Sequence, residues 1–434
     1  MLFINCLVFS ILTLFNYMIA GKRLTYPPFL FCALWLFLFV FRIVFTQFYL
    51  QDFYPISINT YWLFIAGGVV TTIAGYIVML QNSVDLKANQ AIQTNFPRRF
   101  FITGVETFNI RLVLTVLSVL IFPLFIKYIA AIVIASQVEN IFKSIRYETA
   151  VEGQGFGIYA YVITYAAFLS LLNGYYFWQD QSKSNKRLYI VSLVMAILYG
   201  VCTMGRTPVL SAIVFNIALY LISNKKVKLF RLIRYALLFC ALFIGMGVLM
   251  DKGGDLNSSF TENVNSGVEN LGLYILSPMN AIDVVLNGHE PLKYGMRTFR
   301  FFYVLFNSLG FIKVNTADFD IVDEFIFVPY DVNVYTYYNP YIRDFGALFS
   351  LFCLFIFMCW HSWAFVKCIN NQNSYFPKLT YCFLCYPLIM SIFNDQYATL
   401  FSTWLQLYIF AALFYGLVYV IKKTKSSGAL MPAI

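Results

Sequence analysis

The sequence contains few of the residues that soluble enzymes commonly use for catalysis. Only two of its 434 residues are histidine, and charged residues make up 12% of the chain. Two histidines exclude a His-rich metal site, and no Ser-His-Asp arrangement is visible. None of the nine cysteines lies between Asp251 and Asp344, so no disulfide is expected there. Cys382 and Cys385 have CxxC spacing in an apolar run, which predicts buried thiols because redox or metal chemistry needs an accessible thiolate.

Two further absences limit the possible functions. The first apolar run has no basic region before it and no small-residue cleavage site, so we expect a retained helix and not a signal peptide. The connection 81–110 contains no glycine-rich phosphate loop, which argues against nucleotide binding at that point.

Hydrophobic residues are abundant. They form 60% of the chain, and aromatic residues alone form 20%, with a mean hydropathy of +0.72. These values predict an all-α polytopic integral membrane protein. Stretches long enough to span a bilayer predict about eleven transmembrane helices, at 2–20, 27–45, 59–80, 111–134, 158–178, 188–204, 207–223, 235–250, 345–366, 379–393 and 400–421.

The basic residues predict the orientation of these helices. Of the 30 Lys and Arg, 19 lie in one set of alternate connections and nine in the other, longer set. The positive-inside rule then places the C-terminus in the cytoplasm and residues 251–344 outside, which in a bacterium is the periplasm. The net charge of +10 follows from this topology, so we do not expect nucleic-acid binding.

We therefore predict three parts: transmembrane helices 1–8 in residues 1–250, a large periplasmic loop in 251–344, and helices 9–11 with a cytoplasmic tail in 345–434. The loop holds 12 of the 20 acidic residues and only six bases. Helical spacing of apolar residues predicts short helices at 267–286, kinked at Pro278, and at 297–306. A connection this long is expected to be functional.

Several residues near the predicted outer membrane face are candidates for binding an anionic substrate. Gly205-Arg206-Thr207-Pro208 predicts a tight corner, with Thr207 capping the helix and Arg206 at its start. Arg206 fits either an anion ligand or an interfacial arginine that reaches lipid headgroups. Arg42 lies inside an apolar helix, so its side chain must be paired, extend to the membrane interface or line a cavity. Arg146 lies in the external connection 135–157.

The periplasmic loop adds candidates of two kinds. Arg297, Arg300 and Arg343 suit a diphosphate, because guanidinium groups bind it in bidentate fashion. Tyrosines beside carboxylates suit sugar rings, or form an aromatic belt at the membrane interface. We take Tyr335, Tyr338, Tyr341 and Asp323 as the candidate sugar ligands.

A base for an acceptor hydroxyl is less clearly indicated. His289 has the right intrinsic pKa, but fits a polar helix end as well; Asp344, Asp323 and Glu324 are alternatives. Asp318-Phe-Asp320 matches the DxD pattern of many metal-dependent glycosyltransferases, although this pattern is common in an acidic segment, and we assign no metal and no cofactor.

The arginine corner, the long external loop and the segment Asn333-Val-Tyr-Thr-Tyr-Tyr-Asn-Pro-Tyr-Ile-Arg-Asp-Phe-Gly346 together resemble the Wzy-type O-antigen (oligosaccharide repeat-unit) polymerases. The resemblance implies a GT-C-like glycosyltransferase of the bacterial inner membrane that functions in lipopolysaccharide biosynthesis. It would join undecaprenyl-diphosphate-linked repeat units, one as donor and one as acceptor, at the periplasmic face. In this interpretation Arg206, Arg343, Asp344 and His289 are catalytic, and Arg42, Arg146, Arg297 and Arg300 help to bind substrate.

Two alternatives stay open at this point. An O-antigen ligase would have a similar layout, and a flippase or transporter of lipid-linked oligosaccharide represents a different class. The long loop and the scarcity of charge within the helices favour an enzyme over a transporter. The sequence does not specify the sugars, the linkage, the stereochemistry, or whether a chain-length regulator protein binds.

Overall fold

The computed structural model is almost wholly helical over the residues that it describes. These are 1–48, 53–90, 105–135, 156–224, 260–288, 291–313, 324–328, 331–371 and 374–428, with residues 144, 145, 230, 233, 234 and 237. The strands in these ranges are β1 (Ile326–Phe327) and β2 (Asp331–Val332). They form a short antiparallel pair in which Ile326 is opposite Val332.

The chain divides into two compact units, each built from two separate stretches of sequence. Unit 1 comprises Met1–Gln93 and Lys226–Phe401, and unit 2 comprises Thr94–Lys225 and Ser402–Ile434. These boundaries differ from the linear division at residues 250 and 344 because each unit joins two stretches that are far apart in the sequence.

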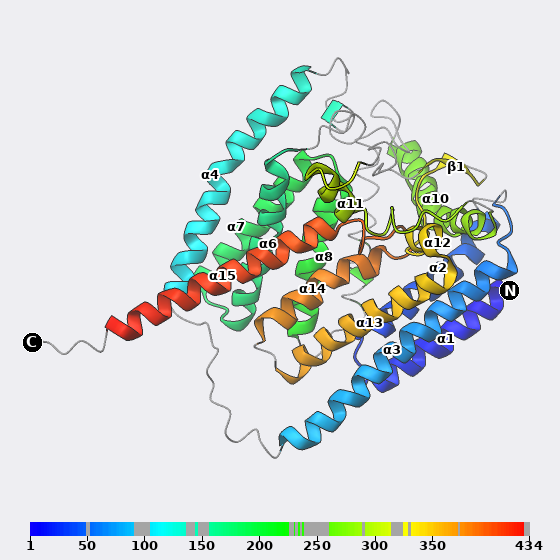
Figure 1. The fold of residues 1–434 in the computed structure, drawn as a ribbon, viewed down its shortest axis with the longest axis horizontal. Helices are drawn as coiled ribbons and strands as arrows, with labels where there is room; N and C mark the ends of the chain where they lie inside the picture. Colours follow the sequence, from blue (N-terminus) through cyan, green and yellow to red (C-terminus); the bar gives the residue numbers. More distant parts are fainter. Residues whose placement is uncertain are drawn as a thin grey trace, which may run out of the picture. The chain divides into compact units, whose positions relative to one another are not determined.

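Unit 1 is built on long apolar helices from both ends of its sequence. These are α1 (Leu2–Ile19), α2 (Pro27–Phe48), α3 (Ile58–Gln90), α13 (Ala347–Asn370) and α14 (Tyr375–Met390). Helix α3 packs against both α1 and α13, and Figure 1 shows these three helices side by side. Buried aromatic residues such as Phe9, Trp35 and Phe64 fill the core between them.

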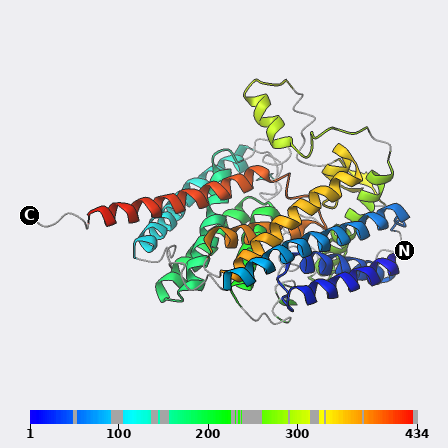
Figure 2. The same cartoon turned by 60° about the horizontal axis from the view of Figure 1, so that its bottom comes forward.

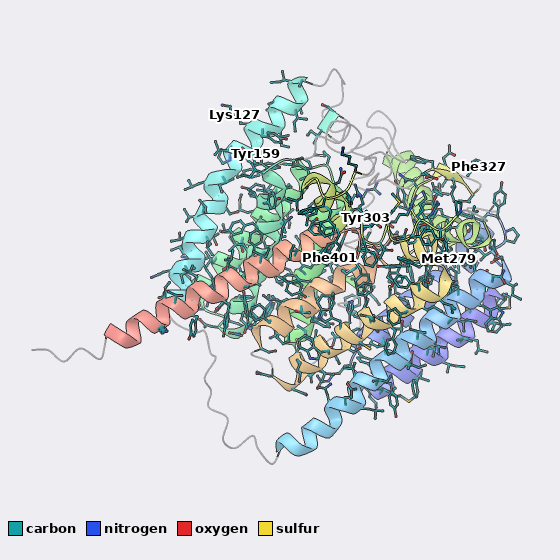
Figure 3. All side chains as sticks on the ribbon, viewed as in Figure 1. Lys127, Tyr159, Met279, Tyr303, Phe327 and Phe401 are labelled. Atoms are coloured by element: carbon teal, nitrogen blue, oxygen red, sulfur yellow. The ribbon has the colours of Figure 1, made fainter. Side chains whose placement is uncertain are left out.

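The polar segment of unit 1 holds the shorter elements. Helix α10 (Phe260–Asn287) packs on α2, α3 and α12, with its Met279 fully buried (Figure 3). It is followed by α11 (Arg300–Ser308), the β1–β2 pair and α12 (Asn339–Phe345). Figure 2 shows the yellow-green α11 standing out from the long helices. Phe301 and Phe302 of α11 contact Phe401, each with its ring centroid at 5.2 Å.

Unit 2 contains α4 (Val105–Ala135), α6 (Tyr159–Gln179), α7 (Lys183–Cys202), α8 (Arg206–Ser223) and most of α15 (Phe401–Gly428). Helix α7 packs on α4, α6 and α8. Phe125, Tyr159 and Tyr199 form an aromatic core, and the Tyr159 hydroxyl donates to the Leu124 carbonyl at 3.3 Å. Tyr159 and the neighbouring Lys127 of α4 are labelled in Figure 3.

Eight helices in the described part of the chain are long and apolar enough to cross a membrane: α1, α2, α3, α4, α7, α8, α13 and α15. Eight of the eleven expected stretches thus coincide with candidate membrane-spanning helices, which fits an all-α, multi-pass membrane protein. The expected stretches 158–178 and 379–393 are helices α6 and α14, which are not among these eight; α14 has only 16 residues. Most of stretch 235–250 lies outside the described residues.

The predicted loop helices also form, with different limits. Helix α10 extends from Phe260 to Asn287, longer than expected at its N-terminal end, and includes Pro278. Helix α11 begins at Arg300, so the prediction that Arg297 and Arg300 share one helix was wrong. Residues 294–299 form turns instead, and Tyr294 and Gly295 have φ of +47° and +92°. A helix cannot continue through two residues in this left-handed region.

Candidate functional site

The segment that carries the family resemblance lies inside unit 1, where buried tyrosines fix α12 in place. The ring of Tyr338 packs against Trp35 and Phe64, with centroids at 6.0 Å in both cases. The ring of Tyr337 contacts Tyr341 at 4.9 Å, and its backbone N–H donates to the Ser391 carbonyl at 2.8 Å. These contacts fasten α12 to both the long helices and the end of α14.

Three tyrosines in this segment are predicted from the sequence to bind sugar. Tyr335, Tyr338 and Tyr341 are each exposed by no more than 1%. Because a buried ring has no free face for a sugar to stack on, we base the proposal below on charged side chains and interpret these rings as structural.

A buried carboxylate that no sequence motif identifies, that of Asp395, anchors this aromatic cluster. Asp395 accepts a hydrogen bond from the Tyr341 hydroxyl at 3.0 Å. It also accepts from the backbone N–H groups of Tyr397, Ala398 and Thr399 at 3.1, 2.9 and 3.1 Å. Burial raises the pKa of Asp395 to about 6, and these donors offset only part of that rise. The sequence feature that could have identified Asp395 is its position as an isolated acid between two apolar stretches.

Asp344 connects α12 to the segment before α11. Its fully buried carboxylate accepts hydrogen bonds from the backbone N–H groups of Arg297 at 3.1 Å and Thr298 at 2.5 Å. Next to it, the backbone N–H groups of Lys293 and Tyr294 donate to the carbonyls of Arg343 and Asp344, at 2.9 and 3.2 Å. Asp344 therefore acts as a clamp that holds residues 293–298 against the end of α12.

This clamp gathers three cations, Lys293, Arg297 and Arg343, which we call the basic corner. Arg343 is buried, and its Nε donates to Asn339 Oδ1 at 3.0 Å. Its guanidinium carbon lies 5.4 Å from the centre of the Tyr335 ring.

Glu324 connects Lys293 and Arg297 to Tyr335, the tyrosine that lies next to Arg343. Its carboxylate lies 3.6 Å from Arg297 and 4.0 Å from Lys293, and its carbonyl accepts from the Tyr335 hydroxyl at 3.0 Å. The Glu324 side chain is 65% exposed, whereas that of Arg297 is 19% exposed. The corner is thus open on the side of Glu324 and closed on the side of Arg343.

Arg42 is held in a separate hydrogen-bonded network of unit 1. It donates to Asn280 Oδ1 of α10 at 2.6 Å and to the Tyr54 carbonyl at 2.9 Å. One turn along α10, Asp283 accepts from the hydroxyl groups of Ser57 and Thr60 at the start of α3. The buried charge therefore joins α2 and α10 next to a capped helix end, which explains how an arginine is tolerated within an apolar helix.

Arg206 lies in unit 2, at the first residue of α8. Gly205 is the N-cap, without a side-chain cap hydrogen bond, so the prediction that Thr207 caps this helix was wrong. Instead, the Thr203 hydroxyl accepts from the Gly205 N–H at 3.1 Å and stabilises the corner one step earlier. Pro208 occupies the first helical turn, as predicted. Arg206 is half-buried, as is Arg300 at the start of α11.

Some predicted residues lie outside the described part of the chain. They are His289, Arg146, Asp323 and the pair Asp318 and Asp320. Their proposed roles stay predictions.

Arg111, which the sequence analysis does not select as a site residue, is buried inside unit 2. It donates to Asn173 Oδ1 at 3.3 Å and to Asn185 Oδ1 at 2.8 Å, and its guanidinium carbon lies 4.0 Å from the Tyr176 ring centre. The three partners come from α6 and α7, so Arg111 of α4 joins three helices. The sequence does not reveal this because the partners are more than 60 residues away.

Comparisons with protein-family models, with curated protein sequences and with solved structures found no match to this chain.

Proposed function

We propose that this protein is a membrane glycosyltransferase that polymerises lipid-linked oligosaccharide repeat units, as the resemblance of residues 333–346 implies. The observation that carries the proposal is the basic corner, because it lies directly at the end of that segment. Lys293, Arg297 and Arg343 are held together by the backbone and side-chain contacts of Asp344, Tyr335 and Glu324. We propose that this corner binds the diphosphate of an undecaprenyl-diphosphate-linked donor.

The chemistry of such a transfer suits these side chains. The bond between the anomeric carbon and the diphosphate oxygen breaks, and a bond to an acceptor hydroxyl oxygen forms. Negative charge builds up on the departing diphosphate, and fixed guanidinium groups stabilise it without having to reorganise. Arg343 is well suited because Asn339 and Tyr335 already orient its guanidinium group.

The acceptor hydroxyl must also lose its proton. Of the bases predicted from the sequence, Asp344 has its carboxylate occupied by two backbone N–H groups, which suits a positioning role. Glu324 is exposed at the open side of the corner, so we favour it as the base among the described carboxylates. His289 and Asp323 stay candidates.

The remaining predicted arginines are assigned more remote roles. Arg42 is proposed to lie near the path of the lipid tail, and Arg300 near the entrance formed by α11. Arg206 belongs to unit 2, so we propose its contact with an anionic substrate separately from the basic corner. The distribution of Lys and Arg supports an inner-membrane location with the basic corner facing the periplasm.

A lipopolysaccharide gel from a strain lacking the gene tests this proposal and separates it from its alternatives. Loss of a polymerase leaves lipid A core carrying a single repeat unit, and the wild-type gene restores the ladder. Loss of a ligase or of a flippase leaves bare core, with lipid-linked units retained on the undecaprenyl carrier. A normal ladder in the deletion strain would contradict the proposal.

A further inference from the structure

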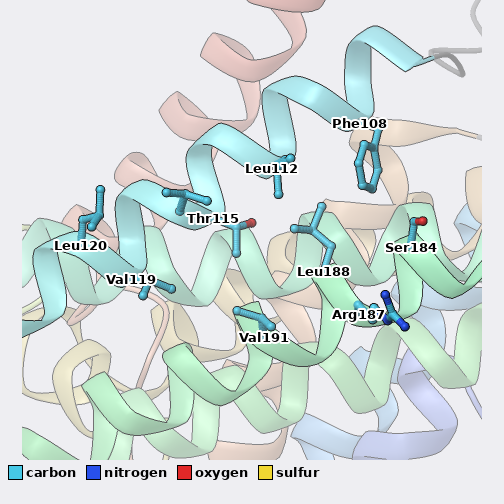
Figure 4. Close-up of a pocket in the computed structure, with 10 residues that line it drawn as sticks. Phe108, Leu112, Thr115, Val119, Leu120, Ser184, Arg187, Leu188 and Val191 are labelled. Carbon is cyan, nitrogen blue, oxygen red and sulfur yellow. The ribbon is translucent and has the colours of Figure 1, made fainter.

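A concave groove lies in unit 2 on the surface shared by α4 and α7. Its volume is about 430 Å³, which falls within the range of roughly 300–1,000 Å³ typical of small-molecule pockets. Figure 4 shows Leu112, Val119 and Leu120 of α4 facing Leu188 and Val191 of α7 across it. Both helices are long and apolar enough to cross a membrane, so the groove runs along two candidate membrane spans.

The groove is apolar along most of its length and polar at one end. Its α4 residues recur at spacings of three and four, and its α7 residues do the same, so each helix contributes one continuous face. Ser184 and Arg187, in the first turns of α7, line the end nearest Phe108 (Figure 4). Arg187 is exposed, as are Leu112 and Val191.

This arrangement selects a particular kind of ligand. Exposed leucine and valine side chains on a membrane span favour hydrocarbon, whereas a guanidinium group and a hydroxyl favour a phosphate oxygen. The first turn of α7 adds Lys183 and Lys186 to Arg187, and the preceding connection holds a single acid, Asp180, so the polar end has an excess of positive charge. A molecule with an acidic head and a long apolar tail satisfies both ends at once.

We propose that this groove is a binding site for an anionic glycerophospholipid, with its phosphate at Ser184 and Arg187 and one acyl chain between α4 and α7. The positive-inside rule places this end of α7 at the cytoplasmic face. The site is therefore separate from the basic corner, for which we propose a periplasmic orientation, and its ligand is not the glycosyl donor.

Binding of defined lipids to the purified full-length protein tests the proposal. The protein in a non-ionic detergent is titrated with phosphatidylglycerol, with phosphatidylcholine of the same acyl chains, and with inorganic phosphate, and bound lipid is counted by native mass spectrometry. We expect phosphatidylglycerol to bind more tightly than phosphatidylcholine, and inorganic phosphate to compete poorly because it lacks a tail.

Two pairs of variants locate the site. Arg187→Gln should weaken phosphatidylglycerol binding about fivefold, as expected for one basic residue near an anionic headgroup. Lys186→Gln removes the same charge one residue away, outside the groove, and should have little effect. Leu112→Trp should obstruct the tail, whereas Val113→Trp, on the adjacent exposed position, should not.

Each contrary result overturns the proposal in a distinct way. Equal effects of the Arg187 and Lys186 variants would mean that the lipid responds only to general positive charge. Equal binding of the two lipids would remove the anionic selectivity, and full competition by inorganic phosphate would mean that the groove does not hold a tail. All four substitutions are at exposed positions, so an unchanged thermal transition is expected and is the control for folding.

Discussion

Two buried arginines, Arg111 in unit 2 and Arg343 in unit 1, are held in the same way but have different neighbours. Each donates to an asparagine side-chain oxygen, and each lies over a tyrosine ring. Arg111 is enclosed by α4, α6 and α7, and its asparagine partners are themselves bonded to Thr115 and Asp180. These contacts explain the burial of Arg111, because they make it a link between the three helices.

Arg343 differs because the segment that carries Lys293 and Arg297 is hydrogen-bonded to the end of its helix, through the Arg343 carbonyl and the Asp344 carboxylate. Like charges held close together repel each other, and one of the two nearby carboxylates, Asp344, already accepts from backbone N–H groups. We propose that an anionic ligand binds at this corner. Burial alone therefore does not mark an arginine as functional, and the proposal for Arg343 depends on the basic residues held at the same end of its helix.

The largest expected effect should distinguish the role of Arg343 from that of Arg111. Arg343→Ala should lower the polymerisation rate about 100- to 1,000-fold, the usual cost of removing one group that stabilises transition-state charge. Arg111→Ala should lower the thermal stability of the protein but leave the rate per inserted molecule unchanged. The measurement is ladder formation on a lipopolysaccharide gel, normalised to membrane protein by immunoblot. Equal loss of activity per molecule in both variants would remove the distinction.

The buried Asp395 gives the next largest effect, on stability. The pKa of Asp395 rises from 3.8 in the unfolded chain to about 6 in the folded protein. Between these values the folded state binds more protons than the unfolded state, so stability should fall as pH rises from about 4 to about 6, by about 3 kcal/mol.

Asp395→Asn should abolish that fall, because the variant has no charge to bury. Unfolding of the purified protein in detergent, followed by its thermal transition at several pH values, measures this. Asp331→Asn, at an exposed position on β2, is the matched control and should keep the wild-type pH dependence. A wild-type slope in Asp395→Asn would show that other groups cause it.

Asp344→Asn separates the positioning role from general-base catalysis. The amide group would face the N–H groups of Arg297 and Thr298, and loss of these charge-assisted hydrogen bonds should cost about 1.5–3 kcal/mol of stability. A positioning residue lowers the rate without changing the shape of its pH profile. If Asp344 is the base instead, the acidic limb of the profile should disappear.

The smallest effect tests the packing of the tyrosine segment. Gly67 of α3 lies directly against the Tyr338 hydroxyl, so a methyl group there would overlap it. Gly67→Ala should destabilise the protein by about 1–3 kcal/mol through overpacking. Tyr338→Phe removes the hydroxyl, which has no hydrogen-bond partner among the described residues, and should restore most of that loss in the double variant. Equal stability of the Gly67→Ala single and double variants would contradict this contact.

How far the sequence predicts the structure depends on the range of the interactions involved. Apolar runs are local, so they located most of the long helices, and they located α10 within the polar segment. Turn geometry is less local: the start of α11 was misplaced because Asp344, about 46 residues further along, binds the backbone of Arg297 and Thr298. Arginine chemistry alone indicated Arg343, but it did not separate Arg343 from Arg111.

The features that the sequence missed depend on contacts between distant residues. Tyr341 and Asp395 are 54 positions apart, and Arg42 and Asn280 are 238 apart. No local pattern identifies such partners. The tyrosines illustrate the same limit, because an aromatic segment beside acids suits a sugar site and a buried core equally well until burial is known.

Binding of undecaprenyl diphosphate to the purified protein shows whether the basic corner holds a diphosphate. Titration in detergent should give saturable binding to the wild-type protein. We predict that Arg343→Gln weakens it at least about tenfold, through loss of a charge-assisted contact, whereas Arg111→Gln leaves it unchanged. Equal affinity of the wild-type protein and Arg343→Gln for this lipid would contradict the assignment of the basic corner as the diphosphate site.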